Sequence, residues 1–416
     1  MWLRVNTRSV VHTAMSSRYT SPLEDLEVDA IDNVYVYVAD SVRYDSVPDR
    51  VAERGRRFKT VSAALCTPQS LPSIVTGRHA PRHGVTWFHE TLEDAIPTVF
   101  DLEATTGYNE IVWEGRAVRD VLGGPPAVDL ETVESPFVVF EHDNGGHSPY
   151  TGYDEYSPAE MFAELSSVEE LRRLYRETIE ESTDRLEQRL DVLDERGLLE
   201  NTLVVYLSDH GELLCERGGF VGHGLPATPE TVYVPMVFVH DSLSPGDGET
   251  LVRHTDLLPT IDAVISDGKT TVDADGTSLL GDVEPERPTF TQGLMRPPAK
   301  YRGTSLDPNY DASSIWTSDG GYVFNDTLRH VRPLTAIYDA LRSGYTGAFD
   351  SGPSTPRKLV AAFDQYLRSV KTYGEPGISR SDARERIDRL STVSVETSSH
   401  SLDEETKEHL AQLGYR

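Results

Sequence analysis

Five short apolar segments, separated by helical or polar sequence, most constrain how this chain can fold. They are rich in valine and other β-branched or aromatic residues, as buried strands are, and they cover 33–39, 109–113, 136–140, 201–207 and 232–239. Helices are expected between them over Thr98–Thr106 and over Ser157–Arg196, where leucine and isoleucine recur about every 3.6 residues. Strands that alternate with helices predict an α/β fold, in which a mostly parallel central sheet is flanked by helices.

The 416 residues are enough for more than one structural unit, and the sequence changes character twice. Residues 1–30 are polar and are expected to form a lead-in, whereas 31–285 contain the alternating strands and helices. After residue 285 proline and glycine become frequent, and Ser313–Asn325 has the pattern of a hairpin with Asp319-Gly320-Gly321 as its turn. We therefore expect 286–416 to form a smaller C-terminal α+β subdomain with helices near its end.

Acidic residues outnumber basic ones along the whole chain, which gives a formal net charge of −29. Such a surface repels phosphate backbones and anionic membranes, so neither nucleic acid nor a membrane surface is an expected partner. An acid excess of this kind is similar to that of halophilic proteins. No run of about 18 apolar residues predicts a membrane span, and residues 1–20 lack the apolar stretch of a signal peptide. A cytoplasmic location is therefore expected. The sequence does not indicate an oligomeric state.

The predicted strand 201–207 leads into Ser208-Asp209-His210-Gly211-Glu212. Open α/β sheets bind ligands at the carboxyl ends of their parallel strands, which is where Asp209 and His210 would lie. A carboxylate beside an imidazole suits Zn²⁺ or Mn²⁺ better than a ligand set made only of oxygen. The alternative is a strand end at which Asp209 caps a helix and His210 is merely exposed.

Other strand ends carry similar side chains. Asp40 follows the first strand, and Asp143 and His147 lie four residues apart around two glycines after the third. His223 follows Asp209 and His210 after a short loop. Each of these residues alone is compatible with a helix cap or a surface position, but together they predict a metal site at one edge of the sheet.

The segment Cys66–Arg78 supplies a candidate nucleophile. Pro68 and Ser70 are typical of a turn that leads into a helix, and hydroxyl groups there would face free backbone N–H groups, a natural anion site. A threonine or serine coordinated to a metal at such a position becomes a nucleophile. The alternative is a helix start that Thr67 or Ser70 caps.

Four segments in this order resemble those of sulfatases of the alkaline phosphatase superfamily: 33–45, 66–78, 193–212 and 254–260. The segments 234–237 and 275–279 and the ending Leu413-Gly414-Tyr415 are also similar to that family. The resemblance covers roughly residues 30–285 and implies a sulfatase-like catalytic domain over 31–285, alkaline phosphatase-like in fold, with a smaller C-terminal domain. It further implies one or two divalent ions (Zn, Mn or Ca) and hydrolysis or transfer of sulfate or phosphate esters through a covalent enzyme intermediate.

Departures from the sulfatase pattern bear on the nucleophile. Sulfatases make formylglycine within Cys-x-Pro-x-Arg, whereas here Ser70 stands in place of the arginine. Counting back from Thr76-Gly77, the nucleophile position falls on Thr67, which resembles the phosphodiesterase branch and disfavours formylglycine at Cys66. The residue after Asp40 is serine instead of a second aspartate, and Asp209 is paired with His210 instead of asparagine.

The resemblance leaves two arrangements of the site open. In one, Asp40, Thr67, Asp209 and His210 hold one ion, while Asp143, His147 and His223 hold a second. In the other, only one ion binds, and His147 and His223 contact the ester oxygens, with either of them protonating the leaving alcohol. Arg43 and Arg78 lie just beyond the site segments and would either neutralise an anionic ester or form structural salt bridges.

These features predict a metal-dependent hydrolase that acts on sulfate or phosphate esters of a small molecule or a glycan. One alternative is a phosphodiesterase, phosphonate hydrolase or headgroup transferase with a threonine nucleophile on the same scaffold. An alternative of another class is a non-catalytic relative that binds anionic glycans.

Overall fold

The structure is a computed structural model that describes residues 19, 21–112, 116–266, 268–295, 310–325, 355–392, 395, 397–413 and 415. Its largest element is an eight-stranded sheet with the order β10-β2-β9-β6-β1-β5-β4, in which β11 also pairs with β2. The strands are β1 Asn33–Ala39, β2 Arg56–Val61, β4 Thr105–Glu110, β5 Phe137–Asp143, β6 Thr202–Leu207, β9 Tyr233–Val239, β10 Gly246–Asp247 and β11 Val252–Arg253. Only the β2–β9 and β6–β9 pairs are antiparallel. The mostly parallel α/β sheet predicted from the sequence is therefore confirmed.

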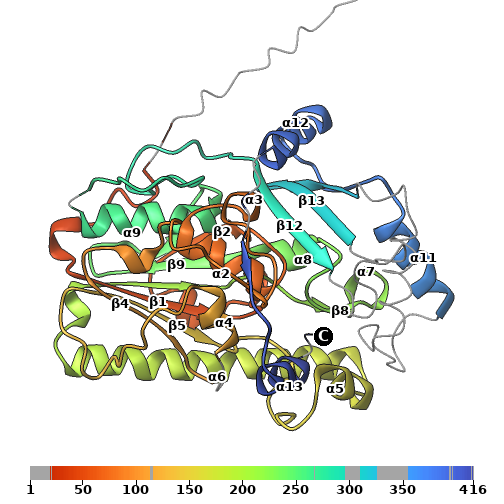
Figure 1. The fold of residues 1–416 in the computed structure, drawn as a ribbon, viewed down its shortest axis with the longest axis horizontal. Coiled ribbons are helices and arrows are strands. Elements are labelled where there is room, and N and C mark those ends of the chain that lie inside the picture. Colours follow the sequence, from red (N-terminus) through yellow and green to blue (C-terminus); the bar gives the residue numbers. More distant parts are fainter. Residues whose placement is uncertain are drawn as a thin grey trace, which may run out of the picture.

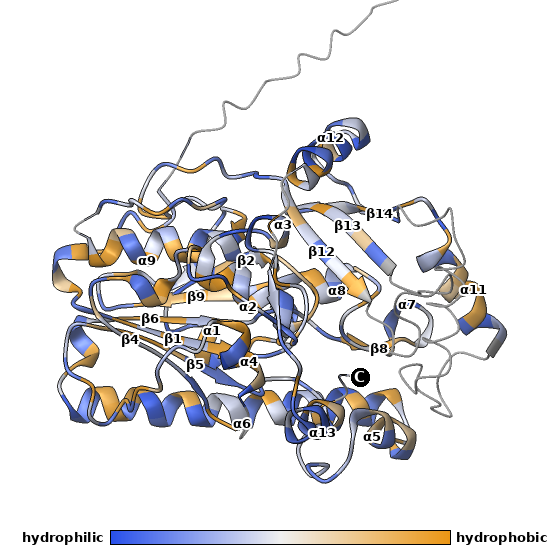
Figure 2. Ribbon diagram, in the orientation of Figure 1, coloured by the Kyte–Doolittle hydropathy of each residue, from blue (hydrophilic) through white to orange (hydrophobic). Residues whose placement is uncertain are grey.

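Helices cover both faces of this sheet (Figure 1). Side chains of β1 alternate between the faces, so Val34, Val36 and Val38 belong to one core cluster while Tyr35 and Tyr37 belong to another. The first cluster packs against α2 (Thr67–Thr76) and α9 (Leu257–Ile265), and the second against α6 (Val168–Glu195). Figure 2 shows hydrophilic and hydrophobic residues alternating along α6, as expected of a helix with one buried side.

A second, antiparallel sheet has the order β12-β13-β14-β15. Its strands are β12 Thr289–Met295, β13 Tyr310–Thr317, β14 Gly320–Phe324 and β15 Val370–Gly374. The predicted hairpin is confirmed, but its turn is Ser318-Asp319 and not Asp319-Gly320-Gly321, because Gly320 and Gly321 already pair with Thr317 and Trp316. The helices α11 (Thr355–Tyr366) and α12 (Arg380–Ser391) accompany this smaller subdomain.

The C-terminal segment then returns to the large sheet domain (Figure 1). The short strand β16 (Ser398–Ser399) pairs with β3 (Glu90–Thr91), and α13 (Glu404–Gln412) follows. Leu410 and Tyr415 are buried in the same core cluster as β1 and α2. The end of the predicted C-terminal subdomain thus packs against the main domain.

The remaining elements are short or flank longer ones. They are α1 Asp49–Ala52, α3 Ala80–His83, α4 Ala117–Val121, α5 Pro158–Glu164, α7 Glu216–Gly219, α8 Pro229–Val232, β7 Leu213–Leu214 and β8 Val221–Gly222. Among the described residues, none of the helices has the length and apolar composition that crossing a bilayer requires.

Several expected elements differ from the structure. The single helix expected over Ser157–Arg196 is two helices, α5 and α6, and the strand expected over 109–113 is β4, which starts four residues earlier and ends at Glu110. The helix predicted over Thr98–Thr106 is wrong: Thr98 and Asp101 form a capping box, but it opens only a single 3-10 turn, Val99–Asp101. The β-branched pair Thr105-Thr106 then begins β4, because β4 pairs with β5 along its whole length. In addition, β5 continues to Asp143, three residues beyond the predicted end, and this extension determines which side chains reach the site.

Candidate active site

The candidate site lies where three neighbouring parallel strands reach the same edge of the large sheet. β1 leads directly into Asp40, β6 is followed by Ser208, Asp209 and His210, and β5 lies beside β1. The helix α2 begins at this edge with Thr67. All of these residues are almost completely buried. The edge is the position at which open α/β sheets bind ligands.

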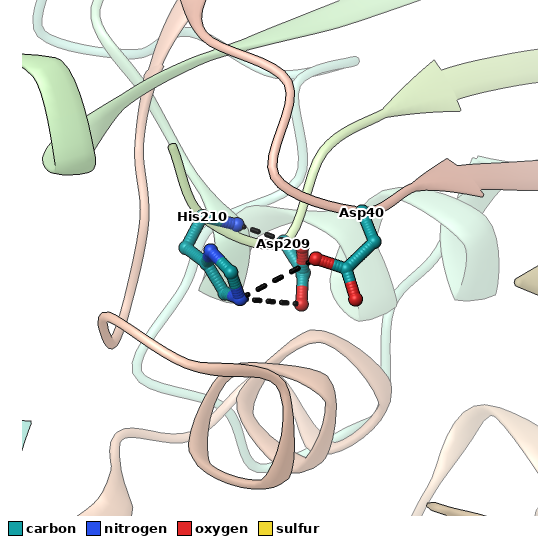
Figure 3. A group of neighbouring side chains, drawn as sticks. All are labelled: Asp40, Asp209 and His210. Atoms are coloured by element: carbon teal, nitrogen blue, oxygen red, sulfur yellow. Dashed lines mark hydrogen bonds and ion pairs between the residues drawn. The ribbon is translucent and has the colours of Figure 1, made fainter. Parts of the chain in front are cut away.

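Asp40, Asp209 and His210 form a compact group (Figure 3). One potential ligand atom from each residue lies within 4.8 Å of the other two. His210 Nε2 is 3.5 Å from Asp40 Oδ1 and 3.4 Å from Asp209 Oδ2. Two carboxylates and an imidazole are a ligand set that suits Zn²⁺ or Mn²⁺.

The hydrogen bonds of Asp209 leave room for a cation. Its Oδ1 accepts from the backbone N–H groups of Ser41 and His210, whereas its Oδ2 is buried without a hydrogen-bond partner. Burial, together with the neighbouring Asp40 carboxylate, raises the pKa of Asp209 to about 7. A bound divalent ion would satisfy the Oδ2 atom and hold both carboxylates ionised at neutral pH.

The orientation of His210 also fits a metal ligand. Its Nδ1–H donates to the Gly211 carbonyl oxygen at 3.1 Å, which leaves the Nε2 lone pair directed at the two carboxylates. Burial and the nearby His223 lower the pKa of His210 well below its usual value, so the imidazole is neutral. A histidine whose second nitrogen donates to a carbonyl is typical of metal sites. The buried Asp40–Asp209–His210 group can therefore bind a divalent metal.

Thr67 contacts this group directly. Its hydroxyl donates to Asp40 Oδ2 at 3.1 Å, and its Oγ1 is 3.3 Å from His210 Nε2. Cys66 is the N-cap residue of α2, buried one position earlier. The two candidate nucleophiles thus lie at the same helix start, and the hydroxyl of Thr67 is the one that points at the acidic group.

His147 and His223 are brought to the same place. The His223 ring centroid lies 4.4 Å from that of His210 and 4.8 Å from that of His147. His223 Nδ1 donates to Glu212 Oε2 at 3.1 Å. Burial acts to lower the pKa of His223, but the Glu212 carboxylate outweighs it and raises the pKa. Burial lowers the pKa of His147 to about 4, so the two histidines differ in their readiness to hold a proton.

The structure does not bring Asp143 to the ligand group. β5 continues to Asp143 as its last residue. Because side chains alternate along a strand, the Asp143 carboxylate lies on the opposite face from His142 and faces α6. Its Oδ2 and Oδ1 lie 2.6 and 2.9 Å from Nε and Nη2 of Arg185. Among the described residues, a single group of side chains is arranged as a metal site, and Asp143 is not part of it.

Arg43 and Arg78 are likewise engaged elsewhere. The Arg43 guanidinium forms ion pairs with Asp45 and Glu216, at 2.6 and 2.9 Å. Arg78 Nη2 lies 3.1 Å from Asp273 Oδ2. Both arginines therefore form structural salt bridges, which was one of their two expected roles, and neither is part of the proposed site.

Three residues of the site were not singled out from the sequence. His142 Nε2 lies 3.4 Å from Asp40 Oδ2, and Glu212 holds His223. Burial acts to lower the pKa of His142, but Asp40 and the nearby Glu110 outweigh it and raise the pKa well above its usual value. Tyr415 places its hydroxyl 3.1 Å from Thr67 Oγ1. His142 precedes Asp143 and Glu212 follows His210 closely, so both lie beside predicted site residues. Tyr415 belongs to the ending that is similar to the family, but no local pattern predicts its contact with Thr67.

A buried histidine behind the site connects its elements. His254 Nε2 donates to the Ser208 carbonyl oxygen at 2.9 Å, and its Nδ1 accepts from the Ala63 backbone N–H at 3.2 Å. The same Nδ1 lies 3.1 Å from the Ser70 hydroxyl, which donates to the Asp209 carbonyl oxygen. Burial lowers the pKa of His254 to about 3, so a neutral ring holds these segments together.

Comparisons with known proteins agree with this architecture. A family model described as Sulfatase matches residues 118–265. The chain is 31% identical over 419 residues to the low-salt glycan biosynthesis sulfotransferase Agl7 of Haloferax volcanii, covering 95% of this chain and 99% of that protein. It is 28% identical over 249 residues to a choline-sulfatase of Rhizobium meliloti, covering 49% of this chain and 47% of that sulfatase.

Solved structures show the same fold. A phosphonate monoester hydrolase of Agrobacterium radiobacter superposes with a TM-score of 0.54 at 16% identity, covering 81% of this chain and 96% of that one. A 2-O GAG sulfatase superposes with a TM-score of 0.58 at 14% identity, covering 89% of this chain and 95% of that one. At these identities the similarity concerns the fold alone.

Proposed function

Because this chain belongs to the sulfatase family of the alkaline phosphatase superfamily, we propose that it is a metal-dependent enzyme that takes the sulfuryl or phosphoryl group of an ester onto Thr67. The observation that carries the proposal is the position of Thr67 Oγ1, 3.1 Å from Asp40 Oδ2 and 3.3 Å from His210 Nε2. A hydroxyl that donates to a carboxylate keeps its lone pairs available for attack on the central atom of the ester.

Asp40, Asp209 and His210 would hold the divalent ion. When bound there, such an ion supplies positive charge that polarises the ester oxygens and lowers the pKa of the nucleophile. Asp40 orients the Thr67 hydroxyl and accepts its proton at Oδ2. The engagement of Asp143 with Arg185 favours the arrangement with one ion, in which His147 and His223 face the ester.

Departure of the leaving alcohol requires a proton, and His223 is the favoured donor. Its Nδ1–H is held by Glu212, which in turn accepts from the Tyr150 hydroxyl at 3.3 Å. A carboxylate behind an imidazole stabilises the cationic ring, so that His223 can give a proton from Nε2 to the leaving oxygen. His147, whose pKa burial lowers to about 4, is neutral and is assigned to binding the non-bridging oxygens.

The covalent Thr67 ester is then resolved either by water, which is hydrolysis, or by an acceptor hydroxyl, which is transfer. The nearly full-length similarity to Agl7, whose name describes a glycan biosynthesis sulfotransferase, favours a sulfuryl group and a glycan among the substrates. We therefore propose sulfate-ester cleavage with passage of the sulfuryl group to an acceptor hydroxyl as the reaction to test first.

The test compares Thr67→Val with Cys66→Ala. Valine keeps a branched side chain at the start of α2 and removes only the attacking oxygen, so we expect no turnover and no covalent adduct. Cys66→Ala is expected to retain most activity. The assays use an aryl sulfate, an aryl phosphate and a bis-aryl phosphate with Zn²⁺ or Mn²⁺, with and without an added glycan acceptor. Mass spectrometry of the peptide that contains both residues locates any adduct.

Each outcome bears on a stated alternative. A sulfuryl adduct on Thr67 that is absent from Thr67→Val supports the proposal, and preference for the bis-aryl phosphate would indicate a phosphodiesterase instead. Formylglycine at Cys66, or full turnover by Thr67→Val, would overturn the assignment of the nucleophile. Binding of sulfated glycans without turnover of any ester would indicate a non-catalytic relative.

A further inference from the structure

The described C-terminal residues, 397–413 and 415, dock against residues 86–93 beside the site. The Ser398 backbone N–H donates to Glu93 Oε1 at 2.6 Å, and the His400 N–H donates to the His89 carbonyl oxygen at 2.8 Å. Asp403 caps α13 by accepting from the Thr406 N–H, and Leu410 is buried on the helix. These contacts fix the segment over the main domain rather than over the smaller sheet.

The segment places the ring of Tyr415 inside the site. Tyr415 is 9% exposed, and its backbone N–H donates to the Leu410 carbonyl oxygen at 2.8 Å. One side of the ring packs edge-on against Phe88, with ring centroids 4.8 Å apart. The rings of His147 and His223 lie 5.9 and 5.8 Å away. The phenol is therefore held between the apolar core and the two histidines assigned to the ester.

The hydroxyl of Tyr415 reaches the reacting atoms. It lies 3.1 Å from Thr67 Oγ1 and 3.4 Å from His147 Nε2. Since Thr67 donates its only proton to Asp40, the proton between the two hydroxyl groups belongs to Tyr415. An ordinary phenol, with a pKa of about 10, carries its proton at neutral pH, so Tyr415 can donate it.

We propose that Tyr415 is a catalytic residue, which donates a hydrogen bond to a non-bridging oxygen of the group being transferred. This inference rests on the proposed function, because it takes Thr67 Oγ1 as the attacking atom. When Oγ1 bonds to sulfur or phosphorus, the oxygens on that atom lie within reach of a donor that is already 3.1 Å from Oγ1. Charge develops on those oxygens in the transition state, where a fixed donor stabilises it most.

The hydroxyl and the ring of Tyr415 have separable roles. The ring contacts with Phe88, His147 and His223 would survive replacement by phenylalanine, whereas the hydrogen bonds to Thr67 and His147 would not. Tyr415→Phe therefore isolates the donor. Tyr373→Phe is the matched control, because Tyr373 lies on β15 of the smaller sheet, where its hydroxyl bonds to Gln365.

The experiment measures kcat and KM for an aryl sulfate and an aryl phosphate in both variants, together with the inhibition constant of vanadate. Loss of one donor of this kind costs about 10²-fold in kcat. We expect that loss in Tyr415→Phe with little change in KM, weaker inhibition by vanadate, and wild-type values in Tyr373→Phe. A chain that ends at Leu413 is expected to be at least as slow as Tyr415→Phe.

Contrary results separate this inference from the proposed function. Wild-type kcat in Tyr415→Phe, while Thr67→Val is inactive, would overturn the role of Tyr415 and leave Thr67 as the nucleophile. An equal loss in Tyr415→Phe and Tyr373→Phe would also overturn it, because the effect would not be specific to the site. Higher activity of the chain that ends at Leu413 would mean that Tyr415 blocks the site instead. An adduct on a residue other than Thr67 would refute the proposed function itself.

Discussion

Acid should weaken the fold through buried neutral histidines, of which His254 is the clearest case. Its ring is fully buried and bonded to Ala63 and Ser208 as a neutral group. Burial lowers the pKa of His254 from its ordinary 6.5 to about 3. Between these two values the unfolded chain binds a proton that the folded protein excludes. Stability is therefore complete above about pH 6.5 and is lost as the pH falls through this window.

The size of the effect follows from the same two values. Each pH unit below the ordinary pKa costs about 1.4 kcal/mol for as long as the folded protein stays unprotonated. At pH 5 the contribution of His254 is thus a loss of about 2 kcal/mol relative to pH 7. Other buried histidines add to the total, so the contribution of His254 must be isolated by difference.

Urea unfolding of the wild type and His254→Gln at pH 7 and at pH 5 provides that difference. The variant is expected to be less stable at pH 7, because it loses the bonds that join Ala63 to Ser208. Between pH 7 and pH 5, the free energy of unfolding of the variant should fall by about 2 kcal/mol less than that of the wild type.

His83→Gln provides an independent second case. His83 is fully buried in α3 beside Ser73, and burial lowers the pKa of His83 to about 3 as well. In His83→Gln, the fall in the free energy of unfolding between pH 7 and pH 5 is expected to be smaller than in the wild type by a similar amount. If either variant kept the pH dependence of the wild type, the histidine concerned would be protonated in the folded protein, and the argument from burial would fail.

Two further predictions concern the metal and the leaving group. After dialysis against Zn²⁺ or Mn²⁺, elemental analysis should find one ion fewer in Asp209→Asn than in the wild type and no change in Asp143→Asn, since Arg185 already neutralises Asp143. Loss of an ion from Asp143→Asn would instead support the arrangement in which Asp143 helps to hold a second ion. Glu212→Gln, which removes the carboxylate behind His223, should lower kcat about 10²-fold for alkyl esters and far less for nitrophenyl esters, whose leaving group needs no proton. An equal loss for both would exclude His223 as the proton donor.

Much of this protein is determined by local sequence. The β-branched segments at 33–39 and 201–207 form buried strands because such a strand needs little more than a short apolar run and a turn at each end. In a mostly parallel sheet the carboxyl ends of strands lie at the same edge, so the sequence also places Asp40 and Asp209 at one edge, whereas the pairing that makes these two strands neighbours is long-range. The resemblance to the sulfatase pattern, counted from Thr76-Gly77, likewise implies that Thr67 is the hydroxyl at the start of α2, where the structure has it.

Tertiary structure decided which of the neighbouring side chains belong to the candidate site. Along β5, His142 faces Asp40 while Asp143 faces Arg185, and this assignment depended on the strand continuing three residues past its predicted end. Pairing along a strand is set by the neighbouring strand, which local sequence does not reveal. Tyr415 is separated from Thr67 by 348 positions, and only the packing of α13 and β16 brings the two hydroxyl groups together. The sequence thus determined the scaffold and the metal-binding edge, whereas long-range packing decided what surrounds the nucleophile.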